Sequence, residues 1–243
     1  MKRVLKIFGE RNTGTNYFSE LILKNFDVEL LDGKLRKGNL LTFNEWTKDL
    51  YFSFTKKHNL GWKHSSINID LIKKHNNQPV IITLTKNPYS FLLSLFKRPY
   101  HYKGNKPDTF SAFLSSKWGV RKRDNYIKEY YTNPIVLWNK KNQSYINLKT
   151  ANIVSLLFTY EELLADPAKV LKKISVACYL PLGKKISNID SSTKNDNKNF
   201  SDYQKYYLNE EWRKSISNEE LLIINSHLDE EVMSFFNYSK IAT

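Results

Sequence analysis

Short apolar runs recur along the first 160 residues of the chain and are typical of buried strands. They are rich in Val, Ile and Leu, and polar stretches separate them. The predicted strands lie at 3–8, 27–31, 60–64, 79–85 and 152–160.

Helical spacing of apolar side chains follows the three longer runs. Residues 14–25 predict a helix directly after a glycine turn, and Pro88 suits the first turn of a second helix. Asp166 and Pro167 are typical of the N-cap and the first residue of a third helix. Strands that alternate with helices favour a parallel, doubly wound sheet. The predicted fold class is therefore α/β, a three-layer sandwich with a central parallel sheet flanked by helices.

Three other regions complete the predicted arrangement. Residues 107–148 are expected to be mostly helical, and the polar, asparagine-rich segment 184–206 is expected to be a loop. Residues 217–238 are expected to form one amphipathic helix that packs on the sheet.

Length and cysteine content limit the class of protein. The 243 residues fit a single domain, 1–243, and are enough to bury a sizeable core. The one cysteine, Cys178, excludes a disulfide within the chain and a cysteine-based zinc site, so a cytoplasmic setting is expected. We expect neither a secretion signal nor a membrane span, because the apolar runs are too short for both.

The charge balance points to anionic partners. Lysine and arginine exceed aspartate and glutamate by 38 − 24, a formal net charge of +14. Such a balance favours nucleotides, nucleic acid, acidic glycans or an anionic membrane, without choosing among them. A lysine-rich solvated surface accounts for part of it.

The candidate chemistry begins in the stretch "VLKIFGERNTGTNY", residues 4–17. Gly9 and Gly14 have the spacing of a phosphate-binding loop, but the lysine that follows in nucleoside triphosphate loops is here Thr15. Glycines at both positions allow the backbone to approach a ligand closely, although an ordinary glycine turn has the same pattern.

The backbone amides and side chains of this turn also favour binding of an anion. Backbone amides from Asn12 to Asn16 would lie at a helix N-terminus, where the dipole attracts negative charge. The hydroxyls of Thr13 and Thr15 add donors, and Arg11 adds a positive charge.

Polar residues also follow other predicted strands. "GWKHSS" places Lys63 beside His64, and a histidine of near-neutral pKa suits a general base. "LTKNPYSFLLS" places Lys86 at a strand end and Ser94 eight residues later, on the next helix. "FTYEELLADP" ends a strand at Tyr160, which is suited either to stacking on a base or to the core. Taken one at a time, His64, Ser94 and Tyr160 are equally typical of structural residues.

Together these stretches resemble the sulfotransferases that use 3′-phosphoadenosine 5′-phosphosulfate (PAPS). "GERNTGTNY" is similar to the family's 5′-phosphosulfate loop K-[ST]-G-T-[ST], and "TKNPYSFLLS" to its 3′-phosphate motif R-N-P-x-D-x-x-x-S. "GWKHSS" resembles the segment that holds the catalytic histidine, and "YEEL" the family's "YEDL" segment, whose tyrosine lies near the adenine. The four motifs occur in the family's order between residue 5 and about residue 175.

The resemblance implies a P-loop NTPase-like sulfotransferase fold and a set of roles. His64, Lys63 and Arg11 would be catalytic, with His101 and Glu10 in reserve. PAPS, with 3′-phosphoadenosine 5′-phosphate (PAP) as its product, would bind through a larger group of residues. That group is Arg11, Asn12, Thr13, Gly14, Thr15, Asn16, Lys86, Ser94 and Tyr160.

Two positions depart from the family pattern. The loop lysine is replaced by Asn12, so that Arg11 would supply its charge, and the 3′-phosphate arginine is replaced by Lys86, which loses bidentate geometry. No metal is expected. The basic segment 184–206 would close over the nucleotide, unless it is simply a surface loop.

Two other functions fit parts of the sequence. A P-loop nucleotide or small-molecule kinase shares the expected fold but needs ATP and magnesium, and a non-enzymatic nucleic-acid-binding protein would explain the charge. No known nucleic-acid-binding signature is present, so a nucleic-acid partner is not expected. The basic surface and the tryptophans favour a sugar or glycan acceptor, while small phenols, lipids and peptide tyrosines stay open. Specificity residues are expected within 33–60 and 100–148.

Overall fold

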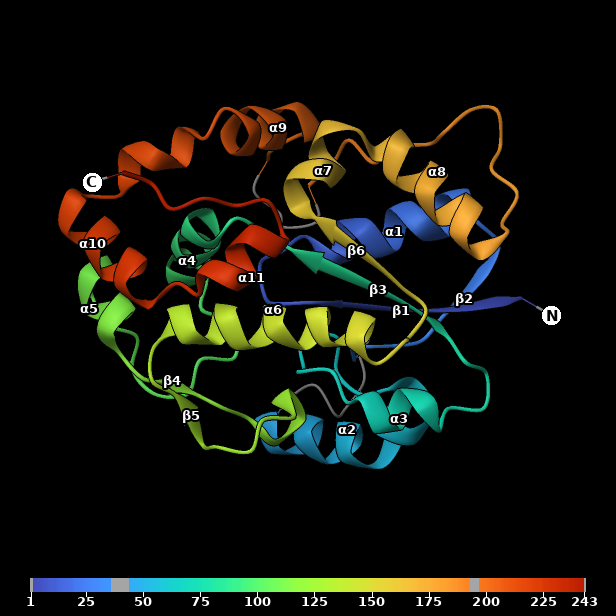
Figure 1. Cartoon of the computed structure of the whole chain (residues 1–243), viewed down its shortest axis with the longest axis horizontal. Coiled ribbons are helices and arrows are strands. Elements are labelled where there is room, and N and C mark those ends of the chain that lie inside the picture. Colours follow the sequence, from blue (N-terminus) through green and yellow to red (C-terminus); the bar gives the residue numbers. More distant parts are fainter. Residues whose placement is uncertain (1, 36–43, 193–196, 243) are drawn as a thin grey trace.

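A four-stranded parallel sheet forms the centre of the molecule (Figure 1). The computed structural model describes residues 2–35, 44–192 and 197–242. The sheet has the strand order β2-β1-β3-β6. Its strands are β1 (Arg3–Gly9), β2 (Val28–Leu30), β3 (Val80–Thr85) and β6 (Ser155–Thr159).

Burial on both faces explains why these segments form strands. Every residue of β3 is buried, and so is every residue of β1 after Arg3. Parallel strands covered by helices on both faces read as continuous apolar runs rather than as an alternation. The predicted strands at 3–8, 27–31, 79–85 and 152–160 are therefore confirmed.

Helices cover both faces of the sheet in Figure 1. On one side lie α1 (Thr15–Asn25), α7 (Tyr160–Ala165), α8 (Pro167–Cys178) and α9 (Phe200–Leu208). On the other lie α2 (Glu45–Asn59), α3 (Ile69–Lys73) and α6 (Pro134–Thr150). This arrangement is the predicted three-layer α/β sandwich.

The remaining helices gather beyond the carboxyl ends of the strands. They are α4 (Pro88–Lys97), α5 (Phe110–Ser115), α10 (Asn218–His227) and α11 (Glu230–Phe235). Asn87 caps α4, and Asp166 caps α8 by accepting a hydrogen bond from the amide of Lys169, as its sequence predicts. None of the helices in the described ranges is long and apolar enough to cross a bilayer.

One sequence prediction in the first half of the chain is wrong. Residues 60–64 form no strand, because Leu60 and Gly61 take positive φ angles of 59° and 82° and turn the chain after α2.

Residues 107–148 are mostly helical, as predicted, through α5, α6 and a short 3₁₀ turn. Between these helices lie the antiparallel ribbon β4 (Trp118–Gly119) and β5 (Tyr130–Tyr131) and the 3₁₀ turn, Lys122–Asp124.

Two further corrections concern the C-terminal part. The segment predicted as a loop at 184–206 becomes helical from Phe200, since Asn199 and Asp202 form a capping box at the start of α9. The ending is two helices instead of one, because Asp229 caps a new helix after Leu228. These helices contact α5 and α6 rather than the sheet.

Candidate active site

The carboxyl ends of three strands meet at one level. Gly9 of β1 pairs with Leu84 of β3, which in turn pairs with Phe158 of β6. The glycine loop, Lys86 and Tyr160 therefore leave the sheet side by side. Ligands of open α/β sheets bind at this edge.

The glycine loop is a tight turn that ends at the start of α1. Asn12 and Gly14 take positive φ angles of 62° and 88°, and the hydroxyl of Thr13 donates to the carbonyl of Glu10 at 2.6 Å. Thr15 is buried as the first residue of α1. No side chain caps this helix, so its first amides are left to a ligand, and the dipole favours an anion there.

Arg11 points into the protein instead of toward this helix end. Its guanidinium is 1% exposed and pairs with Glu10 at 2.6 Å and with Asp124 at 2.9 Å. Burial opposes its charge, but the two carboxylates outweigh burial and raise the pKa of Arg11. It also lies over the ring of Trp62 at 4.6 Å. Two carboxylates already balance the charge of Arg11.

His64 is held beside the loop by a hydrogen bond of its ring. The Nδ1 atom lies 2.5 Å from the carbonyl oxygen of Gly9, which can only accept, so Nδ1 carries the proton. Nε2 is then left with its lone pair. Burial, followed by the charges of Lys63 and Arg11, lowers the pKa of His64 well below 6.5. The neutral ring is therefore a base at physiological pH.

Lys63 reaches across to the first turn of α1. Its Nζ donates to Oδ1 of the exposed Asn16 at 2.6 Å. Burial, with a contribution from Lys34, lowers the pKa of Lys63 to about 7. The structure thus brings His64, Lys63 and the glycine loop together.

Lys86 and Ser94 form the second polar centre. Lys86 is fully buried, and its Nζ donates to the Ser94 hydroxyl at 2.9 Å and to the carbonyl of Asn12 at 3.5 Å. The ammonium also lies 3.9 Å from the ring centroid of Tyr207 and 5.3 Å from that of Tyr160. Burial lowers the pKa of Lys86 to about 7, against the opposing charge of Glu161.

Tyr160 packs against the loop at Gly14. A Cβ at Gly14 would lie 2.5 Å from Tyr160 Cε2, so only glycine fits at this contact. The ring of Tyr160 meets that of Tyr207 edge-on, with centroids 5.1 Å apart. These contacts join the loop, the start of α7 and α9 in one aromatic wall.

Two cavities flank this wall. One, of about 150 Å³, lies beside Ser94 and includes Asn12, Arg98 and Tyr206. The other, of about 30 Å³, lies between Gly14, Tyr160, residues 189–192 and the start of α9 at Phe200 and Tyr203.

Sequence reasoning missed the residues that α9 adds to the site. Tyr203, Tyr206 and Tyr207 line the larger cavity, and the stretch "DYQKYYL" shows aromatic residues at the i, i+3 and i+4 spacing of one helix face. The Asn-rich composition of the preceding segment hid this signal. Residues 193–196 of that segment lie outside the described residues.

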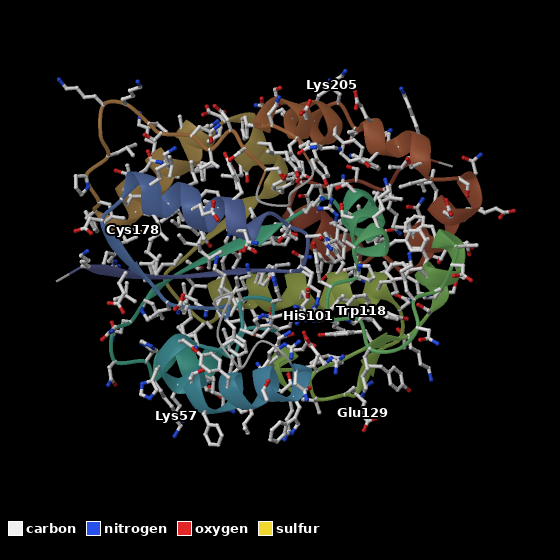
Figure 2. All side chains as sticks on the ribbon, turned by 180° about the vertical axis from the view of Figure 1, so that it is seen from behind. Lys57, His101, Trp118, Glu129, Cys178 and Lys205 are labelled. Atoms are coloured by element: carbon white, nitrogen blue, oxygen red, sulfur yellow. The ribbon has the colours of Figure 1, made fainter. Side chains whose placement is uncertain are left out.

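The two reserve candidates are engaged elsewhere. Glu10 accepts hydrogen bonds from Arg11, and His101 Nδ1 lies 3.1 Å from the Glu45 carboxylate. Burial lowers the pKa of His101 to about 4. Trp118 is buried, and Figure 2 shows Lys57 pointing outward from α2. Within the described residues, no three acidic, histidine or cysteine side chains gather in a metal-binding group.

Two solved structures share this architecture. The crystal structure of mouse sulfotransferase SULT7A1 complexed with PAP aligns with a TM-score of 0.53 and 17% identity, over 96% of this chain and 85% of that chain. The crystal structure of a sulfotransferase from Alicyclobacillus acidocaldarius aligns with a TM-score of 0.52 and 10% identity, over 98% and 97%. No family model and no curated protein matches the chain by sequence. The chain has the sulfotransferase fold, which confirms the predicted fold class.

Proposed function

We propose that this chain is a sulfotransferase that moves a sulfuryl group from PAPS to a hydroxyl or amine acceptor. One observation carries the proposal: the neutral base His64 and the cation Lys63 lie at the mouth of an anion-binding loop, next to the Lys86–Ser94 pair. The fold of the solved sulfotransferases supports it.

The site fits the two charged ends of PAPS. The amino end of α1, which has no side-chain cap, suits the 5′-phosphosulfate. Lys86 and Ser94 suit the 3′-phosphate, because an anion in the cavity beside Ser94 would stabilise the buried ammonium of Lys86. Tyr160 would lie near the adenine.

PAPS would supply the sulfuryl group, and the residues of this chain would position it and balance its charge. His64 Nε2 would accept the proton of the acceptor as it attacks, and Lys63 would stabilise the negative charge on the departing bridging oxygen. In-line transfer of this type depends mainly on positioning and electrostatics.

The role that we propose for Arg11 differs from the one that the sequence suggests. We assign it to support of the loop, because its guanidinium joins Glu10 to Asp124 behind the loop. Lys63 then provides the charge that Asn12 lacks at the position of the family's lysine. Asn12 would contribute its backbone, and Asn16 would orient Lys63.

We propose a sugar or glycan as the acceptor. Its binding surface would come from residues 44–60 and 100–148, which surround the edge that holds His64. Residues 36–43 of the predicted acceptor region lie outside the described residues. A single domain, 1–243, would contain the whole donor site.

The test is thermal unfolding with PAP, with ATP plus magnesium, and with neither. A ligand at a hundredfold excess over its Kd stabilises the native state by about 2.7 kcal/mol. We expect a shift with PAP alone, followed by transfer of ³⁵S from labelled PAPS to a glycan in an acceptor screen. A shift only with ATP and magnesium would identify a kinase and refute the proposal.

A further inference from the structure

The segment that carries His64 has no sheet partner to hold it. Leu60 and Gly61 turn the chain after α2, and residues 60–64 form no strand. Two backbone hydrogen bonds hold Lys63: the amide of Gly9 donates to the carbonyl of Lys63 at 2.9 Å, and the amide of Lys63 donates to the carbonyl of Gly33 at 3.0 Å. Buried lysine side chains add hydrogen bonds on both sides of Lys63.

Lys6 holds the beginning of the segment. It lies in the middle of β1 with no exposed surface, and its Nζ donates to the carbonyls of Asn59 at 2.5 Å and Gly61 at 2.7 Å. Asn59 is the last residue of α2, so the ammonium also lies at the negative end of the helix dipole. The bonds fix the turn immediately before Trp62.

Lys141 holds the end of the segment. It lies on α6 with no exposed surface, and its Nζ donates to the carbonyl of His64 at 2.8 Å and to that of Asp124 at 3.3 Å. The same ammonium lies 3.8 Å from the carboxylates of Glu10 and Asp124. Lys141 therefore connects the backbone of His64 to the charged cluster behind the loop.

We propose that Lys6 and Lys141 are positioning residues, which fix the backbone on both sides of Lys63 and so hold the His64 ring against the carbonyl of Gly9. The catalytic part of this inference rests on the proposed function. Burying an ammonium is costly, and an apolar side chain of similar length would fill the same space at lower cost. The apolar side chain cannot supply the hydrogen bonds to the segment.

The first variant is Lys6→Met, which keeps the length of the side chain and removes its donors. We expect a slightly lower melting temperature, because the carbonyls of Asn59 and Gly61 lose their donor, a kcat at least about tenfold lower, and a Kd for PAP that rises by a smaller factor than kcat falls. Lys240→Met is the matched control, because it removes the same charge from a surface pair with Glu230. It should leave all three quantities unchanged.

The second readout is the ring tautomer of His64, measured by ¹⁵N NMR with PAP bound. The unaltered chain should show the Nδ1–H form, and Lys6→Met should show a mixture, because the ring no longer meets the Gly9 carbonyl. A kcat within about twofold, or an unchanged tautomer in Lys6→Met, would overturn the proposal.

A second variant and a second reading of the results make the test decisive. Should Lys6→Met not fold, Lys141→Met takes its place with the same two readouts. That variant comes second because it leaves Glu10 and Asp124 with Arg11 alone, which should lower the melting temperature. Should the unaltered chain transfer no sulfuryl group, the proposed function fails, while the tautomer still decides whether Lys6 positions the ring.

Discussion

Binding of PAP should weaken steeply as the pH rises above 7, because of Lys86. Burial holds the pKa of this ammonium at about 7 in the free protein. A phosphate beside it would restore the charged form, so binding takes up a proton when Lys86 is neutral. The affinity contributed by Lys86 is therefore complete below pH 7 and is lost as the pH rises.

The size of the effect follows from the charged fraction. For a group of pKa 7 that fraction falls by about 25-fold between pH 7.5 and 9, so the Kd for PAP should rise by about 25-fold through Lys86 alone. The 3′-phosphate stays dianionic over this range, with a second pKa of about 6. Lys63, whose pKa is also about 7, would add a similar dependence through the 5′-phosphate.

Isothermal titration calorimetry in two buffers of different ionisation enthalpy counts the protons directly. At pH 8, the Lys86 contribution should be about 0.9 proton per PAP bound. Lys86→Arg removes this contribution, because arginine stays charged at every pH used, and leaves the part due to Lys63. Adenosine 5′-diphosphate, which lacks the 3′-phosphate, should give the same reduced uptake. Equal proton uptake by the unaltered chain and Lys86→Arg would refute the reasoning.

Three other predictions concern the loop and the base. His64→Ala should lower turnover about 100-fold or more while PAP still binds, since only the general base is lost, and near-normal turnover would remove His64 from the mechanism. Because the pKa of His64 is lowered, turnover in the unaltered chain should stay constant down to pH 6.5 and fall only below it; a midpoint at or above 6.5 would contradict the buried neutral ring. Gly14→Ala should raise the Kd for PAP more than about tenfold, because the new methyl group meets Tyr160 at 2.5 Å and φ is +88°. Gly104→Ala is the control, with φ +110° and nothing within 4 Å, and an equal loss in both variants would exclude the contact as the cause.

The sequence predicts the sheet and the donor loop because both depend on local patterns. The strands are continuous apolar runs, and Asp166 with Pro167 marks a helix start that the structure confirms. The resemblance to the 3′-phosphate motif pairs Lys86 with Ser94, and their side chains do lie 2.9 Å apart. Their role toward a nucleotide stays a prediction.

The rest depends on contacts between distant residues, which no local pattern contains. Arg11 reads as a loop cation, yet its partner Asp124 lies 113 residues away and turns it inward. The apolar residues within 60–64 predict a strand, but hydrogen bonds from Lys6 and Lys141 hold this segment as a turn. The local sequence indicates a special role for Lys6 only by placing a lysine in the middle of an apolar strand.

The alignment of Gly9, Leu84 and Phe158 across the sheet has a consequence for folding. The candidate site has three parts, each contributed by a strand roughly 75 residues from the next along the chain, so the site exists only when all three strands have paired. Contacts this distant in sequence form late and cooperatively. PAP would therefore bind only the fully folded protein. Its effect should appear as slower global unfolding, so that the whole sheet, and not the loop alone, is protected kinetically.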